Sequence, residues 1–163
     1  MVSDEQPPPA PEGARAIELA YRALAARERT VAELRTYLER KRVGPAAIEA
    51  AVAELRAAGY LDDATYARRF AEDKRALERW GCERIGRELR RRGVDPALVD
   101  EVLAEQERGA ERAAALELLA ERLGAPPRDD RERDRAWRML VRRGYEPELA
   151  YEVVRMVARR AVV

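Results

Sequence analysis

The 163-residue chain carries 32 lysines and arginines against 31 aspartates and glutamates, so its formal net charge is only +1. This balance gives no bulk attraction to nucleic acid or to a membrane surface, and an electrostatic partner would have to be recognised by a local patch. The absence of histidine excludes His-based triads and His-containing zinc sites, and the single cysteine excludes an intramolecular disulfide. Hydrophobic residues make up 47% of the chain with only one Phe, which favours an all-α fold.

The N-terminal 13 residues are rich in proline and show no apolar periodicity. A segment of this kind buries too little apolar surface to offset the entropy cost of ordering, so residues 1–13 are predicted to form a disordered tail. They also lack the apolar run of a signal peptide, and no stretch approaches the roughly 18 uncharged apolar residues of a membrane span. We therefore expect a soluble, cytoplasmic protein with no membrane partner.

A long-period repeat runs through the rest of the chain. Pro45, Pro96 and Pro147 each follow a short turn and recur at intervals of 51 residues. A period near 50 with apolar residues in register is typical of stacked helical units that cannot bury their apolar faces alone. We predict three tandem three-helix repeats, residues 14–60, 61–109 and 110–163, that form an elongated, curved stack. The positions in register are Leu38, Leu89 and Leu140; Ala51, Val102 and Val153; and Val52, Leu103 and Val154.

Local signals place three helices in the first repeat. The first helix is predicted over about residues 14–27, and Thr30 with Glu33 forms a capping box at the start of the second. Pro45 begins the third helix, because a proline in the first turn loses no hydrogen bond, and Gly59 ends it. The stripes predicted to face the core are Leu34 with Leu38, and Ile48 with Val52 and Leu55.

The second and third repeats follow the same plan. Asp62 or Asp63 is predicted to cap a helix whose apolar stripe contains Tyr66, Phe70 and Leu77. A short helix follows over about residues 82–92. In the third repeat the middle helix ends before Gly144, and the last helix of each repeat begins at the proline of that repeat. The sequence thus predicts nine helices in three groups.

Arginines on the short helix of the second repeat form a candidate contact row. Arg84, Arg87 and Arg91 lie on one side of this helix, beside the Ile85 and Leu89 stripe that must face inward. Alternatively, the arginines at 90–92 only complement the negative end of the helix and keep the surface solvated. The full set of predicted partner-binding residues is Lys74, Arg75, Arg79, Arg84, Arg87, Arg91, Arg138 and Arg142.

Other chemistry is less favoured by the sequence. The tryptophans and most tyrosines lie at helix ends or in register with apolar stripes, so packing in the core or in turns is preferred over base stacking. Asp62 and Asp63 have no accompanying carboxylate cluster, and Cys82 has no partner base. We expect no catalytic residue, no metal site and no cofactor, and hence no enzyme.

Two motifs at the centre of the chain resemble those of a known family. Residues 59–63 (Gly-Tyr-Leu-Asp-Asp) with Tyr66 and Phe70, followed by residues 79–94 with their Arg-Trp-Gly and Arg-Gly-Val segments, are similar to the central module of RecX regulatory proteins. Residues 25–38 and 140–145 resemble the flanking modules. The chain departs from the family pattern at Cys82, where a proline is frequent, and at Arg42 and Val43, where a glycine is usual.

The resemblance implies a crescent of three-helix modules that binds the RecA protein in its filament on single-stranded DNA. Such a regulator would mainly inhibit strand exchange, ATP turnover and repressor cleavage, within homologous recombination, DNA repair and the SOS response. We expect a monomer whose direct contact with DNA, if any, is weak. The alternative is a helical-repeat DNA-binding or scaffold protein unrelated to RecA, which would bind naked DNA with a steep salt dependence.

Overall fold

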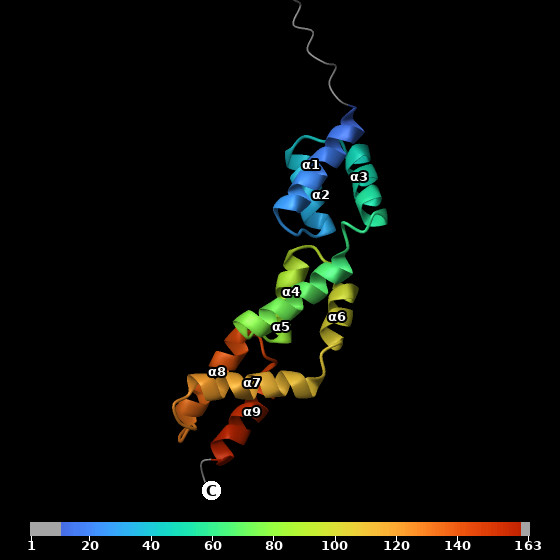
Figure 1. The fold of residues 1–163 in the computed structure, drawn as a ribbon. Helices are drawn as coiled ribbons and strands as arrows, with labels where there is room; N and C mark the ends of the chain where they lie inside the picture. Colours follow the sequence, from blue (N-terminus) through green and yellow to red (C-terminus); the bar gives the residue numbers. More distant parts are fainter. Residues whose placement is uncertain (1–10, 161–163) are drawn as a thin grey trace, which may run out of the picture. The chain divides into compact units, whose positions relative to one another are not determined.

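A computed structural model describes residues 11–160 of the chain (Figure 1). Within that range there are nine helices and no strand, which confirms the predicted all-α class. No helix among these residues is both long enough and apolar enough to cross a bilayer. The helices are α1 (Glu12–Ala26), α2 (Val31–Arg40), α3 (Pro45–Ala57), α4 (Asp63–Glu78), α5 (Cys82–Arg91), α6 (Pro96–Ala104), α7 (Arg108–Arg122), α8 (Asp130–Arg143) and α9 (Pro147–Arg160).

The chain divides into two compact units, residues 1–66 and 67–163, and the division falls within α4. The three repeats at 14–60, 61–109 and 110–163 stay a prediction beside this division. Residues 1–10 of the predicted tail lie outside the described range, whereas Glu12 and Gly13 already belong to α1. The Glu12 carboxylate accepts a hydrogen bond of 2.6 Å from the backbone N–H of Gly44, and this contact fixes the first turn of α1 against the α2–α3 turn.

The first unit packs α1, α2 and α3 around one apolar core (Figure 1). All the residues predicted as inward stripes of α2 and α3 are buried, and small residues of α1 complete the core. Alanines let α1 approach its neighbours closely, because they bury backbone without needing space for a side chain. The core includes Ala16, Ala20, Leu34, Leu38, Ile48, Val52 and Leu55.

Side-chain caps set the helix boundaries of the first unit. The predicted capping box at the start of α2 is confirmed, since the Thr30 hydroxyl accepts from Glu33 N–H at 3.1 Å and the Glu33 carboxylate accepts from Thr30 N–H at 3.2 Å. Asp62 caps α4, as predicted for one of the two aspartates, by accepting from a backbone N–H of its first turn at 3.0 Å. Asp63 instead accepts from the N–H of Val31 at 2.9 Å, so the starts of α2 and α4 are tied together.

The turn after the second helix of each predicted repeat uses the same hydrogen bond three times. The carbonyls of Leu38, Leu89 and Leu140 accept from the N–H groups of Val43, Val94 and Tyr145, at 3.1, 3.1 and 3.2 Å. This six-to-one bond closes a helix when the residue before the donor is left-handed. The left-handed residues are Arg42 (φ 59°), Gly93 (φ 80°) and Gly144 (φ 91°), again 51 residues apart.

In the second unit, α5 and α6 pack through Ile85, Leu89, Val99 and Val102, all of them buried. The predicted stripe of α4 is partly wrong, because the Leu77 side chain is 81% exposed. α4 instead faces its neighbours through the fully buried Ala67 and Ala71. Leu77 lies about 120° around the helix from Ala71, on the solvent side.

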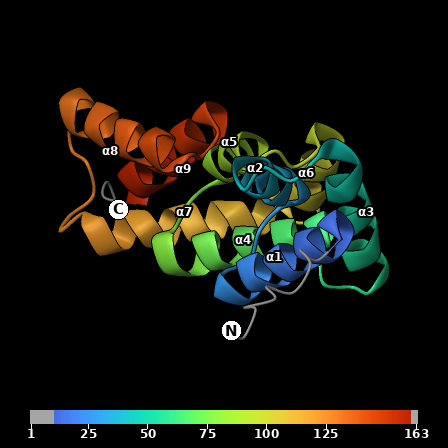
Figure 2. The ribbon, with the colours of Figure 1, turned by 90° about the horizontal axis from the view of Figure 1, so that it is seen from above.

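In the same unit, α7, α8 and α9 form an apolar core of their own. α8 and α9 lie side by side, as Figure 2 shows, and α7 packs on α9. Leu119, Leu140 and Val153 are fully buried between the three helices.

Two turns join these parts of the second unit by backbone hydrogen bonds. Gly81 N–H, between α4 and α5, donates to the carbonyl of Arg143 at 2.9 Å, and Glu83 N–H donates to the carbonyl of Gly144 at 3.0 Å. The Arg143 side chain also donates from Nη1 to the carbonyl of Glu78 at 2.6 Å. The α4–α5 turn and the α8–α9 turn are therefore held in direct contact.

Candidate partner-binding surface

Two aromatic rings meet where α4 ends. Arg79 adopts a left-handed conformation (φ 55°), and the N–H of Trp80 donates back to the carbonyl of Lys74 at 3.1 Å. This turn folds the indole of Trp80 against Phe70, with ring centroids 6.4 Å apart in an edge-to-face arrangement. Both rings remain partly exposed, so the pair forms a platform at the surface rather than part of the core.

Three cations lie over this platform. The Arg84 guanidinium is 4.0 Å from the Trp80 ring centroid, and the Lys74 ammonium is 4.8 Å from the same centroid. Arg92 lies 5.1 Å from the centroid of Phe70. Each such contact stabilises by about 0.5–1 kcal/mol at an exposed site, and Arg is also held in a fixed orientation. We call Phe70, Lys74, Trp80, Arg84 and Arg92 the cation–aromatic cluster.

Glu88 neutralises part of the charge on α5. Its carboxylate accepts from Arg91 at 2.6 and 2.8 Å and from Arg92 at 3.0 Å. The hydrogen bond from Arg91, followed by that from Arg92, lowers the pKa of Glu88 to about 2. Arg91 is thus exposed but committed to an ion pair.

The predicted arginine row of α5 therefore contains three residues in different situations. Arg84 is half-buried on Trp80 and has no carboxylate partner among the described residues. Arg87 is exposed and likewise forms no ion pair within residues 11–160. Arg91 is paired with Glu88. Two cations of the row are free to meet an acidic partner.

The predicted contact residues of α4 mostly bind within the protein. Arg75 Nη2 lies 3.8 Å from the Sγ of Cys82, and Arg79 forms ion pairs with Glu117 at 3.5 Å and Glu121 at 2.8 Å. Both arginines hold α4 to its neighbours. Lys74 pairs with Glu78, one turn further along the same helix.

The residues predicted on α8 are divided in the same way. Arg138 pairs with Asp134 at 2.6 Å, whereas Arg142 is exposed and has no carboxylate partner in the part of the chain that is described. Because Gly144 contacts the backbone of Arg84, the end of α8 lies beside the start of α5. The structure thus brings the two predicted arginine groups to neighbouring helix ends.

Cys82 and the carboxylates are the described residues to consider for nucleophilic or metal chemistry. Burial, and next the negative charge of Glu111, raise the pKa of the Cys82 thiol to about 11, so the thiol is protonated at neutral pH. Within residues 11–160 no group of three or more Cys, Asp or Glu residues is placed to hold a metal ion.

The platform is not among the features predicted from the sequence. Trp80 is predicted there to pack in the core or in a turn, and Phe70 and Arg92 lie outside the predicted partner-binding set. The available signal was a tryptophan at a helix end with Lys74 and Arg84 on either side, a pattern of aromatic and basic residues that favours recognition. Tyr60 is 63% exposed and lies outside the core, and its ring packs edge-to-face on that of Tyr21 with centroids 5.3 Å apart.

Comparisons with known proteins give a consistent result. The second three-helix domain of RecX matches residues 62–103, and the first three-helix domain of RecX matches residues 16–55. The regulatory protein RecX of Mycolicibacterium vanbaalenii is 39% identical over 151 residues, which cover 87% of this chain and 82% of that protein. The regulatory protein RecX of Deinococcus radiodurans is 37% identical over 139 residues, or 85% of this chain and 66% of that protein.

Solved structures share the fold. A crystal structure of RecX from Lactobacillus salivarius has a TM-score of 0.78 at 16% identity and covers 93% of this chain and 98% of that one. A crystal structure of regulatory protein RecX has a TM-score of 0.74 at 18% identity, with 89% and 72% covered. Because both RecX domains match and relatives above 30% identity align over most of their length, the chain belongs to the RecX family.

Proposed function

We propose that this protein binds RecA in its filament on single-stranded DNA and mainly inhibits the recombinase, ATPase and coprotease activities of RecA. The relatives named regulatory protein RecX support a regulatory role. The observation that carries the proposed contact is the pair of unpaired arginines on α5, Arg84 and Arg87, beside the Trp80 platform. A regulator of this kind acts in the cytoplasm, needs no cofactor and has no catalytic activity of its own.

The chemistry of this surface suits a protein partner with exposed carboxylates. The ring contact already restricts the Arg84 side chain. When Arg84 binds a carboxylate, its side chain therefore loses less rotamer entropy than a freely moving arginine would. Unpaired charges at a rim raise the association rate and set orientation, and aromatic residues beside them supply apolar contact area. Arg142 at the end of α8 extends the same charge. We propose that the protein works as a monomer.

Charge reversal at two positions gives the sharpest test. The double variant Arg84→Glu with Arg87→Glu changes the local charge by four units and leaves the Arg91–Glu88 pair in place. We expect at least a tenfold loss in the amount of protein retained by RecA on single-stranded DNA with a slowly hydrolysed ATP analogue, and a matching loss of inhibition of strand exchange. The matched control is Arg40→Glu with Arg56→Glu, two exposed arginines of the first unit.

Three other results of these experiments distinguish RecA regulation from a DNA-binding or scaffold function. A folded double variant that inhibits RecA at wild-type concentrations contradicts the proposed surface. Retention by naked DNA with a steep salt dependence and no preference for the filament supports the DNA-binding or scaffold alternative. ATP turnover should change only when RecA is present, and ATPase activity of the purified protein alone would contradict a non-catalytic regulator.

A further inference from the structure

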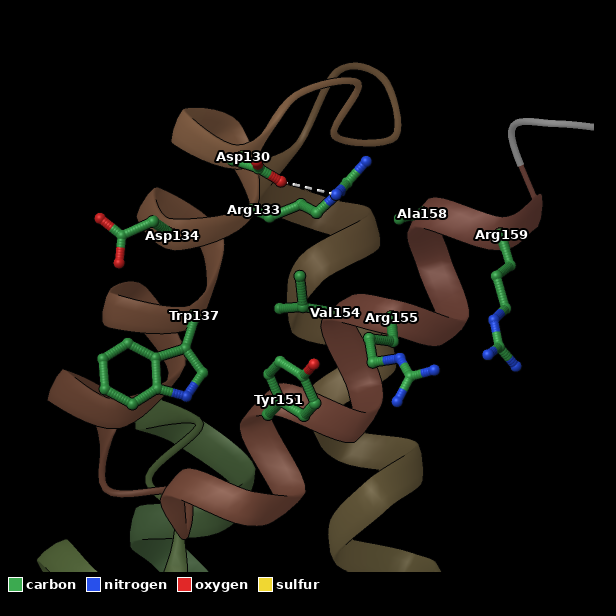
Figure 3. A pocket seen from close by; sticks show the side chains of 9 residues that line it. All are labelled: Asp130, Arg133, Asp134, Trp137, Tyr151, Val154, Arg155, Ala158 and Arg159. Atoms are coloured by element: carbon green, nitrogen blue, oxygen red, sulfur yellow. Dashed lines mark hydrogen bonds and ion pairs between the residues drawn. The ribbon is translucent and has the colours of Figure 1, made fainter.

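A groove of about 650 Å³ lies between α8 and α9 of the second unit (Figure 3). Its volume falls within the range of about 300–1,000 Å³ that is usual for ligand pockets. The lining residues come from both helices: Asp130, Arg133, Asp134 and Trp137 from α8, and Tyr151, Val154, Arg155, Ala158 and Arg159 from α9. None of these residues belongs to the cation–aromatic cluster or to the predicted contact set.

The centre of the groove is apolar and aromatic. Trp137 on α8 and Tyr151 on α9 line it from opposite sides, and the buried Val154 lies next to Tyr151 (Figure 3). The indole Nε1 of Trp137 donates to the carbonyl of Pro147 at 3.0 Å, which fixes the orientation of the ring. Tyr151 is 59% exposed although it lies in the middle of a helix. A large aromatic side chain held open to solvent beside a second ring is a site where an apolar group can be buried.

The two walls carry different charges. On the α8 wall, Asp130 pairs with Arg133 at 2.8 Å and Asp134 pairs with Arg138 at 2.6 Å, so both acids are neutralised.

On the α9 wall, Arg155 and Arg159 form no ion pair within the described residues, and the Arg155 guanidinium lies 5.6 Å from the Tyr151 ring centroid. These two arginines are one turn apart, so their heads can lie along one side of the groove. The unmatched charge of the groove is therefore positive and lies only on α9.

We propose that the α8–α9 groove binds a peptide segment of a protein partner that carries one large apolar side chain with an Asp or Glu within four residues of it. The apolar side chain is buried between Trp137 and Tyr151, and the carboxylate binds Arg155 or Arg159. This inference goes beyond the proposed RecA contact and does not depend on it, because the groove and the α5 surface share no residue.

A peptide fits this groove better than single-stranded nucleic acid. A base could stack on Tyr151, but the α8 wall offers its phosphates no unmatched cation, because Arg133 pairs with Asp130 and Arg138 pairs with Asp134. Two unmatched arginines on one wall suit a single carboxylate better than a continuous phosphate backbone, which binds to a run of cations.

The test uses a phage-displayed library of random twelve-residue peptides, selected on the full-length protein. The sequences enriched should share an apolar residue with an Asp or Glu within four positions. The synthetic form of the most enriched peptide is then titrated into a Trp80→Phe background, where Trp137 is the only tryptophan and reports directly on the groove. We expect a saturable change in its fluorescence.

Two groove variants and one control variant locate the binding. Tyr151→Ala, and separately Arg155→Glu with Arg159→Glu, should each weaken the peptide at least tenfold, whereas Arg131→Glu with Arg135→Glu on α8 should change its affinity less than twofold. The control pair is exposed and does not line the groove. Circular dichroism on every variant confirms that the helices are kept.

Three results would overturn the inference: enriched peptides without acidic residues, binding that the groove variants leave unchanged, or no enrichment above an unrelated helical protein. A twenty-nucleotide oligothymidylate is also titrated into the protein, to test whether the groove binds single-stranded nucleic acid instead. If it changes Trp137 fluorescence more strongly than the best peptide and responds to the same variants, the occupant is nucleic acid and the peptide proposal is wrong.

Discussion

Gly81 and Gly144 contact each other backbone to backbone, although they are far apart in the sequence. A Cβ atom added to Gly81 would lie 2.4 Å from the carbonyl oxygen of Gly144, and one added to Gly144 would lie 2.2 Å from the Cβ of Arg84. No side chain fits at either position without moving a helix end. This contact fixes the α4–α5 turn to the α8–α9 turn, and with it the relative position of Arg84 and Arg142.

Gly81→Ala should therefore lower the free energy of unfolding by about 1–3 kcal/mol, the usual cost of overpacking a close contact. Gly144→Ala should cost at least as much, because its φ of 91° also disfavours any residue with a Cβ. Urea denaturation followed by circular dichroism measures both values. Gly109→Ala is the control, since nothing lies within 4 Å of the added Cβ, and it should leave the protein unchanged or slightly more stable. Equal effects at all three positions would contradict the contact.

Arg42→Gly should stabilise the protein. Arg42 adopts φ 59° at the position where the two later turns have Gly93 and Gly144, and a non-glycine residue is strained there. Relief of this strain stabilises the folded protein, whereas the greater entropy of glycine in the unfolded chain opposes it. We expect a net gain of about 0.5–1 kcal/mol in the free energy of unfolding. Arg40→Gly, within the last turn of α2, is the matched control and should destabilise by about 1 kcal/mol. A loss of stability for Arg42→Gly would show that its side chain matters more than its backbone.

Glu88 should make a pH-dependent contribution to stability. Its pKa is lowered in the folded protein from 4.5 to about 2, first by the hydrogen bond from Arg91. The contribution is complete above pH 4.5 and is lost as the pH falls toward 2, because protonation breaks the pairs with Arg91 and Arg92. The pairs are solvent-screened, so we expect at most about 1 kcal/mol.

The measurement compares wild type and Glu88→Gln by urea denaturation between pH 2 and pH 7. Their difference in unfolding free energy should be largest near neutral pH and should shrink below pH 4.5. Glu101→Gln serves as the control, because this exposed residue of α6 makes no ion pair within residues 11–160. A difference that stays constant across this range would mean that the two arginines do not lower the pKa of Glu88.

Cys82 should react slowly with iodoacetamide in the folded protein. Burial and the charge of Glu111 raise its pKa to about 11, and only the thiolate is nucleophilic. At pH 8 the alkylation rate should be at least tenfold below that of the urea-unfolded chain, and the rate should still be rising at pH 10. Mass spectrometry of quenched samples follows the reaction. A rate that is already half its maximum near pH 8.5 would show an ordinary, solvated thiol.

The sequence by itself determined the helices of this protein and their order. Thr30 with Glu33, the three prolines at intervals of 51 residues and the turns after Leu38, Leu89 and Leu140 all act over a few residues, so their signals are complete within a short segment. The stripes of α2 and α3 were also predictable, because a helical period shows which side is apolar. Recognition of the central motifs added the RecX family, which the comparisons bear out.

The tertiary structure decided which side chains are available for contact. Arg79 binds Glu117 and Glu121 on α7, about 40 residues away, while Arg87 on α5 forms no ion pair within the described residues; the sequence places both among the same predicted contact arginines. Leu77 is exposed because the neighbours of α4 contact its alanine face. Helical periodicity fixes the direction of a side chain around its own axis but not which helix will lie there, and ion pairs and grooves form between segments that are distant in sequence. For that physical reason the Trp80 platform and the α8–α9 groove became visible only in the folded chain.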